Sequence, residues 1–128
     1  MIRVAVDAMG GDYAPEEIIA GAVDAVKENK EIKVLLVGQE QVVREKLSGF
    51  TYDKNQITVV HASEVIATEE PPVNAIRKKK DSSIVVGMNL VKNKEADAFV
   101  SAGSSGAILV GGQVIVGRIK GVERPPLA

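Results

Sequence analysis

The chain has 128 residues, and its 16 basic and 17 acidic side chains give a formal net charge of -1. This near-neutral balance argues against a nucleic-acid-binding protein, which usually carries a basic patch, and a 3% aromatic content without Trp leaves few rings on which bases could stack. With 45% hydrophobic and 26% charged residues, the chain has the composition of one ordinary globular domain.

The composition gives little indication of a metal site, a redox-active cysteine or a membrane-spanning segment. The absence of cysteine excludes disulfides and thiolate metal sites, and the single histidine, His61, cannot form a His-rich metal centre. No apolar run reaches the roughly 18 to 20 residues that span a bilayer. The N-terminal residues enter a strand-like pattern without the regions of a signal peptide. We therefore expect a cytoplasmic protein without a metal or another cofactor, whose contact with membranes is at most peripheral.

Strand-like and helix-like segments alternate in the first half of the chain. Short apolar runs rich in β-branched residues predict strands over residues 2–6, 32–37 and 57–60. Pro15 followed by two acids predicts a helix start, and apolar residues recur at helical spacing from there to about residue 27. A second, short helix is predicted over residues 40–47. This alternation is typical of right-handed βαβ units in a parallel sheet.

The second half is less regular. We expect a short helix that begins at Ser63 and is broken by residues 68–72, then helices over 73–80 and 82–92, the second capped by Asp81-Ser82. A fourth strand is predicted over residues 98–100. The apolar stretch 107–119 follows, and we expect five of its side chains to face a sheet: Ile108, Val110, Val114, Ile115 and Ile119. Residues 121–128 contain no stop signal and lead us to expect further chain.

The loop from Asp7 to Pro15 follows the first strand and enters the first helix. Ligands of open α/β sheets bind at such carboxyl ends, and the pair Gly10-Gly11 allows backbone N–H groups to approach a bound group. The loop lacks the Gly-x-Gly-x-x-Gly dinucleotide fingerprint. An anion site and a tight turn in which Asp12 caps the helix are equally compatible with this spacing.

A second loop, residues 101–106, also lies between a strand and a helix. It offers the hydroxyls of Ser101, Ser104 and Ser105 together with Gly103 and Gly106. Such hydroxyls and the N–H groups of a helix start can hold a phosphate, although a turn with Ser104 or Ser105 as helix cap explains the same residues. We predict that the strands ending at residues 7 and 100 are adjacent, so that both loops open onto one crevice.

Two further features admit two interpretations each. The basic run ending at Lys80 is typical of a solvated helix face, but the Asp81-Ser82-Ser83 that follows would place a helix N-terminus beside concentrated positive charge. His61 lies at the end of the third strand. A structural, hydrogen-bonded role is favoured for this histidine over a role in proton transfer.

The motifs together resemble the PlsX family of fatty acid/phospholipid synthesis proteins. The resemblance rests on segments spread over the chain: Asp7-Ala8-Met9-Gly10-Gly11-Asp12-Tyr13-Ala14-Pro15, His61-Ala62-Ser63-Glu64, Glu70-Pro71-Pro72, residues 77–83, residues 96–103 and Gly121-Val122-Glu123-Arg124-Pro125. It covers all 128 residues in order. One departure is Ser104-Ser105, where the family commonly has Asn-Thr.

The resemblance implies a fold and an activity. The fold would be an α/β/α sandwich with a mostly parallel sheet, similar to isopropylmalate dehydrogenases and phosphotransacetylases. The activity would be transfer of a fatty acyl group from an acyl carrier protein thioester to inorganic phosphate, by a homo-oligomer. Family chains are more than twice as long, so residues 1–128 would be the N-terminal part of the domain, truncated and inactive alone.

The resemblance also implies roles for the residues of both loops. Phosphate would be held by Gly10, Gly11, Ser101, Gly103, Ser104, Ser105 and Gly106, and would attack the thioester directly without a metal. Asp7, Asp12 and His61 are candidates for orienting groups or for proton transfer to the departing sulfur, and Lys80 is a candidate for offsetting charge. A related acyl- or acetyl-phosphate protein, such as a component of the glycine reductase complex, and a non-catalytic α/β binding domain remain alternatives.

Overall fold

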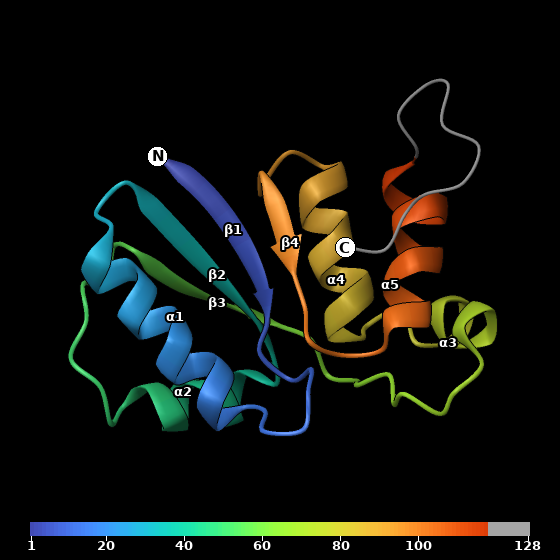
Figure 1. Cartoon of the computed structure of the whole chain (residues 1–128), viewed down its shortest axis with the longest axis horizontal. Coiled ribbons are helices and arrows are strands. Elements are labelled where there is room, and N and C mark those ends of the chain that lie inside the picture. The colour runs from blue at the N-terminus through green and yellow to red at the C-terminus, as the bar shows by residue number, and fades with distance from the viewer. Residues whose placement is uncertain (118–128) are drawn as a thin grey trace.

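The computed structural model describes residues 1–117, which form a four-stranded sheet with helices around it (Figure 1). The strands are β1 (Ile2–Asp7), β2 (Ile32–Gly38), β3 (Ile57–His61) and β4 (Ala98–Val100). They are ordered β3-β2-β1-β4, and every neighbouring pair is parallel. The predicted parallel α/β architecture is confirmed, with each strand within a residue of its expected bounds.

One face of the sheet is covered by α1 (Glu16–Glu28) and α2 (Glu40–Leu47). Alternate residues of β2 point to opposite faces, as the strand period of two requires. Val34 and Leu36 join the core under α1 and α2, whereas Leu35 and Val37 join the core on the other face. All four are buried, which explains why this central strand is an unbroken apolar run.

The opposite face is covered by α4 (Ser83–Lys92). As predicted, Ser82 caps this helix, because its Oγ accepts a hydrogen bond from the Val85 N–H at 3.2 Å. Gly87 lets the helix approach β4, since a Cβ there would lie 2.2 Å from a ring carbon of Phe99. With helices on both faces, the expected α/β/α layering is confirmed.

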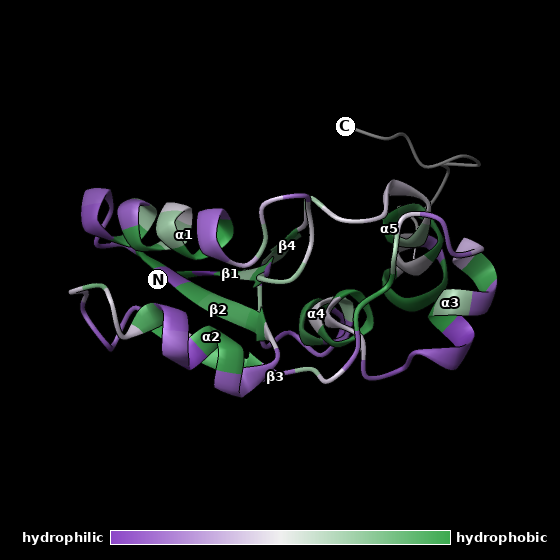
Figure 2. Cartoon of the chain, turned by 90° about the horizontal axis from the view of Figure 1, so that it is seen from below, coloured by the Kyte–Doolittle hydropathy of each residue, from purple (hydrophilic) through white to green (hydrophobic). Residues whose placement is uncertain are grey.

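A third group of helices lies beyond α4: α3 (Pro72–Lys78), α5 (Ser105–Gly111) and the π-helical turn η1 (Gly112–Val116). Figure 2 shows α3 and α5 on the far side of α4 from the sheet. The stretch after residue 107 was expected to face a sheet, and that expectation was wrong. Ile108 and Ile115 instead pack against the cluster of α3 and α4, and Val114 is 71% exposed. Ile119 lies outside the described residues.

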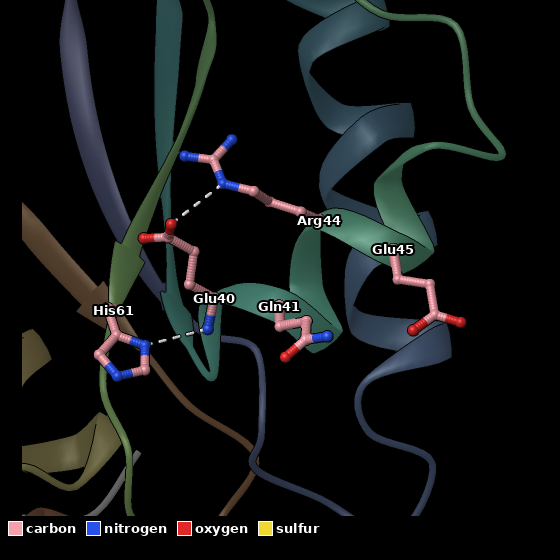
Figure 3. A pocket seen from close by; sticks show the side chains of 5 residues that line it. All are labelled: Glu40, Gln41, Arg44, Glu45 and His61. Atoms are coloured by element: carbon pink, nitrogen blue, oxygen red, sulfur yellow. Dashed lines mark hydrogen bonds and ion pairs between the residues drawn. The ribbon is translucent and has the colours of Figure 1, made fainter.

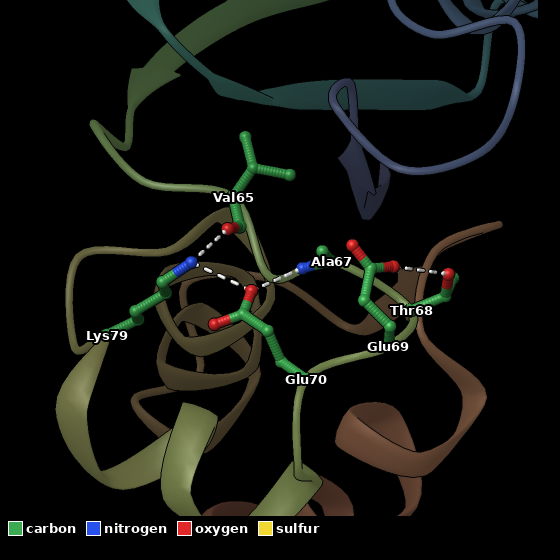
Figure 4. A network of polar contacts seen from close by, with 6 residues as sticks. All are labelled: Val65, Ala67, Thr68, Glu69, Glu70 and Lys79. Atoms are coloured by element: carbon green, nitrogen blue, oxygen red, sulfur yellow. Dashed lines mark hydrogen bonds and ion pairs between the residues drawn. The ribbon is translucent and has the colours of Figure 1, made fainter.

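The segment between β3 and α3 contains no helix, so the short helix expected at Ser63 was also wrong. Glu64 forms a parallel bridge with Ser82 instead. Lys79 fastens the segment from the end of α3, because its Nζ donates to the carbonyl of Val65 and to Glu70 Oε2, both at 2.8 Å (Figure 4). These backbone contacts take the place of the intrahelical bonds that a helix would have made.

Candidate functional site

The loops after β1 and β4 open at the point where the strand order reverses. From β1 the chain proceeds outward to β2 and β3, and then returns to place β4 on the other side of β1. Crevices at such topological switch points are where open α/β sheets bind their ligands. The prediction that the strands ending at Asp7 and Val100 are adjacent is confirmed by the pairing of Val6 with Val100.

A buried carboxylate joins the two loops. Ser101 Oγ donates a hydrogen bond of 2.8 Å to Asp7 Oδ2, and the Gly103 N–H donates to Ser101 Oγ at 3.0 Å. The other oxygen of Asp7 accepts from the Met9 N–H at 3.0 Å. Asp7 is only 2% exposed. Both oxygens of the carboxylate therefore accept hydrogen bonds that fix the backbone path of the two loops.

The glycines allow the loops to pack against each other. A Cβ at Gly10 would lie 2.5 Å from Asp7 Oδ2, 2.9 Å from the Gly103 nitrogen and 3.0 Å from Ser101 Oγ. A Cβ at Gly103 would lie 3.4 Å from the Gly10 Cα. Gly11 has a φ of +105°, a conformation that side chains rarely adopt. Close packing and backbone conformation thus account for all three glycines.

The donors left for an anion come from the start of α5. Ser104 caps this helix by accepting from the Ala107 N–H at 3.2 Å, which confirms one of the two predicted caps and leaves its own hydroxyl proton available. Ser105 is exposed, and the N–H groups of Ser105 and Gly106 lie in the first turn, where a helix offers no carbonyl partner. Gly106 also packs closely on α3, since a Cβ would meet Pro72 Cγ at 2.6 Å.

Asp12 and His61 occupy different surroundings. Asp12 is exposed and does not cap α1, whose N-cap residue is Pro15 without a side-chain bond, so the expected cap was wrong. His61 Nδ1 accepts a hydrogen bond of 3.1 Å from the Glu40 N–H and thereby caps α2 (Figure 3). It borders an open hollow of about 790 Å³ lined also by Gln41, Arg44 and Glu45.

Two carboxylates near β3 and α3 are held ionised by their hydrogen bonds. The Ser63 hydroxyl and N–H donate to Asp81 and lower the pKa of its carboxyl. The hydrogen bond from Lys79 Nζ, followed by that from the Ala67 N–H, lowers the pKa of Glu70. Lys80, the next residue after Lys79, lines a separate hollow beside α3. Within residues 1–117, no hydrogen bond or ion pair joins Lys80 to either glycine loop.

Sequence reasoning singled out Asp7 and Ser101 but did not predict that they bind each other. A signal for this contact exists in the sequence once the strand pairing is known. Val6 and Val100 are partners in adjacent parallel strands, and Asp7 and Ser101 are the residues that follow each of them. Residues one step beyond a paired position leave the sheet side by side.

Comparisons with known proteins agree with the resemblance seen in the sequence. A family model described as fatty acid synthesis protein matches residues 2–128. A phosphate acyltransferase of Clostridium tetani is 50% identical over 127 residues, which are 99% of this chain and 38% of that protein. A phosphate acyltransferase of Syntrophomonas wolfei is 54% identical over 126 residues, 98% of this chain and 39% of that protein. The chain thus spans well under half the length of these relatives.

The described part of the chain has two further features, which concern membranes and metal ions. None of the helices within residues 1–117 is both long and apolar enough to cross a membrane. The same residues contain no group of three or more carboxylate or imidazole side chains placed to hold a metal ion.

Proposed function

The chain belongs to the PlsX family of fatty acid synthesis proteins, and from this we propose that it supplies the phosphate-binding part of a phosphate acyltransferase. The proposed reaction transfers a fatty acyl group from an acyl carrier protein thioester to inorganic phosphate in the cytoplasm. The observation that carries the proposal is the contact of two glycine loops at the switch point between β1 and β4. We extend the proposal to a homo-oligomer, as the resemblance to the family implies.

The reaction needs a held nucleophile and a stabilised intermediate. An oxygen of phosphate attacks the thioester carbonyl carbon and forms a C–O bond, which gives a tetrahedral oxyanion. The C–S bond then breaks, the sulfur takes a proton, and acyl phosphate and a free thiol result. Holding both reactants in place supplies a large part of such a rate, with effective molarities of roughly 10⁵ M or more. Donors aimed at the oxyanion supply much of the rest.

The start of α5 supplies the donors for phosphate. The Ser104 and Ser105 hydroxyls and the first-turn N–H groups all belong to the start of this helix, where its dipole favours an anion; Ser105 is exposed, and Ser104 is 3% exposed. Ser101 has its proton engaged by Asp7, so its part is to position the loop and not to donate to phosphate. The Ser104 cap also accounts for the departure from the family's common Asn, because Ser and Asn are comparable N-caps.

Phosphate binding to this chain tests the first step. We expect Gly103→Ala to weaken binding of inorganic phosphate by tenfold or more in calorimetry, because the new methyl group would lie 3.2 to 3.4 Å from Ser101 Oγ, Asp7 Oδ2 and Gly10 Cα. Gly49→Ala is the matched control, since its only near neighbour would be a carbonyl oxygen at 3.7 Å. Equal phosphate affinity in a folded Gly103→Ala protein would remove the proposed site.

The acyl transfer itself is tested in a chimaera. Residues 1–128 replace the matching part of the Clostridium tetani phosphate acyltransferase, with which they share 50% identity. We expect the chimaera to form acyl phosphate from acyl carrier protein thioester and phosphate, and the Gly103→Ala chimaera to require far more phosphate. A folded chimaera that binds phosphate but transfers no acyl group contradicts the proposed reaction and leaves the phosphate site standing.

A further inference from the structure

A second hollow, of about 290 Å³, lies between α3, α4 and η1. Its floor is apolar, with Ile76 and Val85 only 7% and 5% exposed. Val114 and Ile115 of η1 form a further apolar wall, and Val114 is 71% exposed to solvent. The volume is close to the lower limit of about 300 Å³ for small-molecule pockets. The hollow thus offers a narrow, mainly apolar space, open to solvent, whose lining also includes the polar residue Asn89 of α4.

Two cations flank this apolar space. Arg77 and Lys80 line the hollow, and both side chains are exposed. Lys79, which lies between Arg77 and Lys80 in the sequence, differs from both because its ammonium group is bound by Glu70 and the Val65 carbonyl (Figure 4). The ion pairs formed within residues 1–117 engage neither Arg77 nor Lys80. Both charges are therefore available to a ligand that enters between the helices.

The combination selects one class of ligand. An apolar floor favours an aliphatic chain, because each buried methylene tightens binding by about fourfold. A guanidinium and an ammonium at the rim favour an anionic head group, and the guanidinium can bind a carboxylate or phosphate in a bidentate manner. We propose that this hollow binds a single-chain amphipathic anion, a fatty carboxylate or an acyl phosphate, with its chain on Ile76 and Val85 and its head at Arg77 and Lys80.

This site is separate from the phosphate site at the glycine loops and does not depend on acyl transfer. It would place an acyl anion against α3, whose first residue, Pro72, touches Gly106 in the first turn of α5. A fatty carboxylate and an acyl phosphate share an aliphatic chain and an anionic head group. Probes with a carboxylate or a phosphate head distinguish the two.

Calorimetry with four probes tests the ligand class: decanoate, decyl phosphate, hexanoate and, below its low solubility limit, 1-decanol. We expect saturable binding of decanoate or decyl phosphate, on the order of a hundredfold weaker binding of hexanoate, which has four fewer methylenes, and at least tenfold weaker binding of the uncharged decanol. Tighter binding of decanoate than of decyl phosphate identifies a carboxylate site, and the reverse identifies a phosphate site. No saturable binding of either anion overturns the proposal.

Matched variants then locate the site. The double variant Arg77→Gln, Lys80→Gln should weaken decanoate binding at least tenfold. Val114→Asn should also weaken it, because a polar side chain then replaces part of the apolar wall. Lys78→Gln is the control, because Lys78 is an exposed cation of the same run that does not line the hollow. Equal losses in Lys78→Gln and the double variant show general charge attraction and overturn the assignment. A different result also overturns the assignment. If the parent chain binds no anion and dimerises as its concentration rises, whereas Val114→Asn stays monomeric, a second copy of the chain covers the hollow.

Discussion

Gly10 gives the sharpest test of how the two loops are built. In Gly10→Ala the added Cβ would lie 2.5 Å from Asp7 Oδ2, 2.9 Å from the Gly103 nitrogen and 3.0 Å from Ser101 Oγ. Two of these atoms form the hydrogen bond that joins the loops, and the third is backbone, so none can move without breaking the contact. Overpacking of this kind costs about 1 to 3 kcal/mol, and it should open the crevice at the same time.

The matched control is Gly21→Ala in α1, where a Cβ would have nothing within 4 Å. Alanine is favoured over glycine in a helix by roughly 0.5 to 1 kcal/mol, so this variant should be more stable than the parent protein. At about 4 °C per kcal/mol, the two melting temperatures should differ by roughly 6 to 16 °C in circular dichroism. The close packing of the loops would be refuted if Gly10→Ala had the same melting temperature as Gly21→Ala and bound phosphate with the affinity of the parent protein.

Three further predictions concern single contacts. In a double-mutant cycle by urea unfolding, Asp7→Asn and Ser101→Ala should couple by about 1 to 3 kcal/mol, and additive losses would contradict the joining bond. Ser104→Ala should cost about 1 kcal/mol and Ser104→Asn almost nothing; equal losses would show that Ser104 is not a cap. The Lys79 contact lowers the pKa of Glu70 from its ordinary value, so Glu70→Gln should lose the full stability of the contact at pH 7, and this loss should shrink as pH falls below about 4.5 and through the lowered pKa of the folded state; a loss of stability that does not change with pH would contradict the ion pair.

The sequence predicted the sheet well because its strands are short apolar runs, of which the central strand β2 is buried on both faces. A run such as residues 32–37 has no amphipathic alternative, and β-branched residues bounded by turn signals leave little choice of structure. The position of both loops at strand ends followed from the same pattern. What periodicity could not supply was the partner of β4, because strand order depends on which helix packs on which face.

Two of the wrong expectations share one physical cause. Residues 107–116 are apolar enough to cover a sheet, but α4 already occupies that face, so the stretch packs on α4 and α3 and leaves Val114 exposed. The helix expected at Ser63 did not form because Glu64 makes backbone hydrogen bonds with Asp81 and Ser83, and because Lys79 binds the Val65 carbonyl. In both regions tertiary partners decided a structure for which local propensity was indifferent.

The placement of Asp7 decides where an anion can sit in the crevice. At an effective dielectric constant of about 20, a carboxylate repels a unit negative charge by about 4 kcal/mol at a separation of about 4 Å, and this repulsion falls in proportion as the separation grows. The first turn of a helix attracts an anion by roughly 0.3 to 1 kcal/mol for each charge, and direct hydrogen bonds to charged groups add about 1.5 to 3 kcal/mol. The donors at Ser104 and Ser105 can outweigh the repulsion only if the phosphate stays at their end of the crevice. Because both oxygens of Asp7 already accept hydrogen bonds, this residue is better suited to holding the loops than to taking a proton from the reactants.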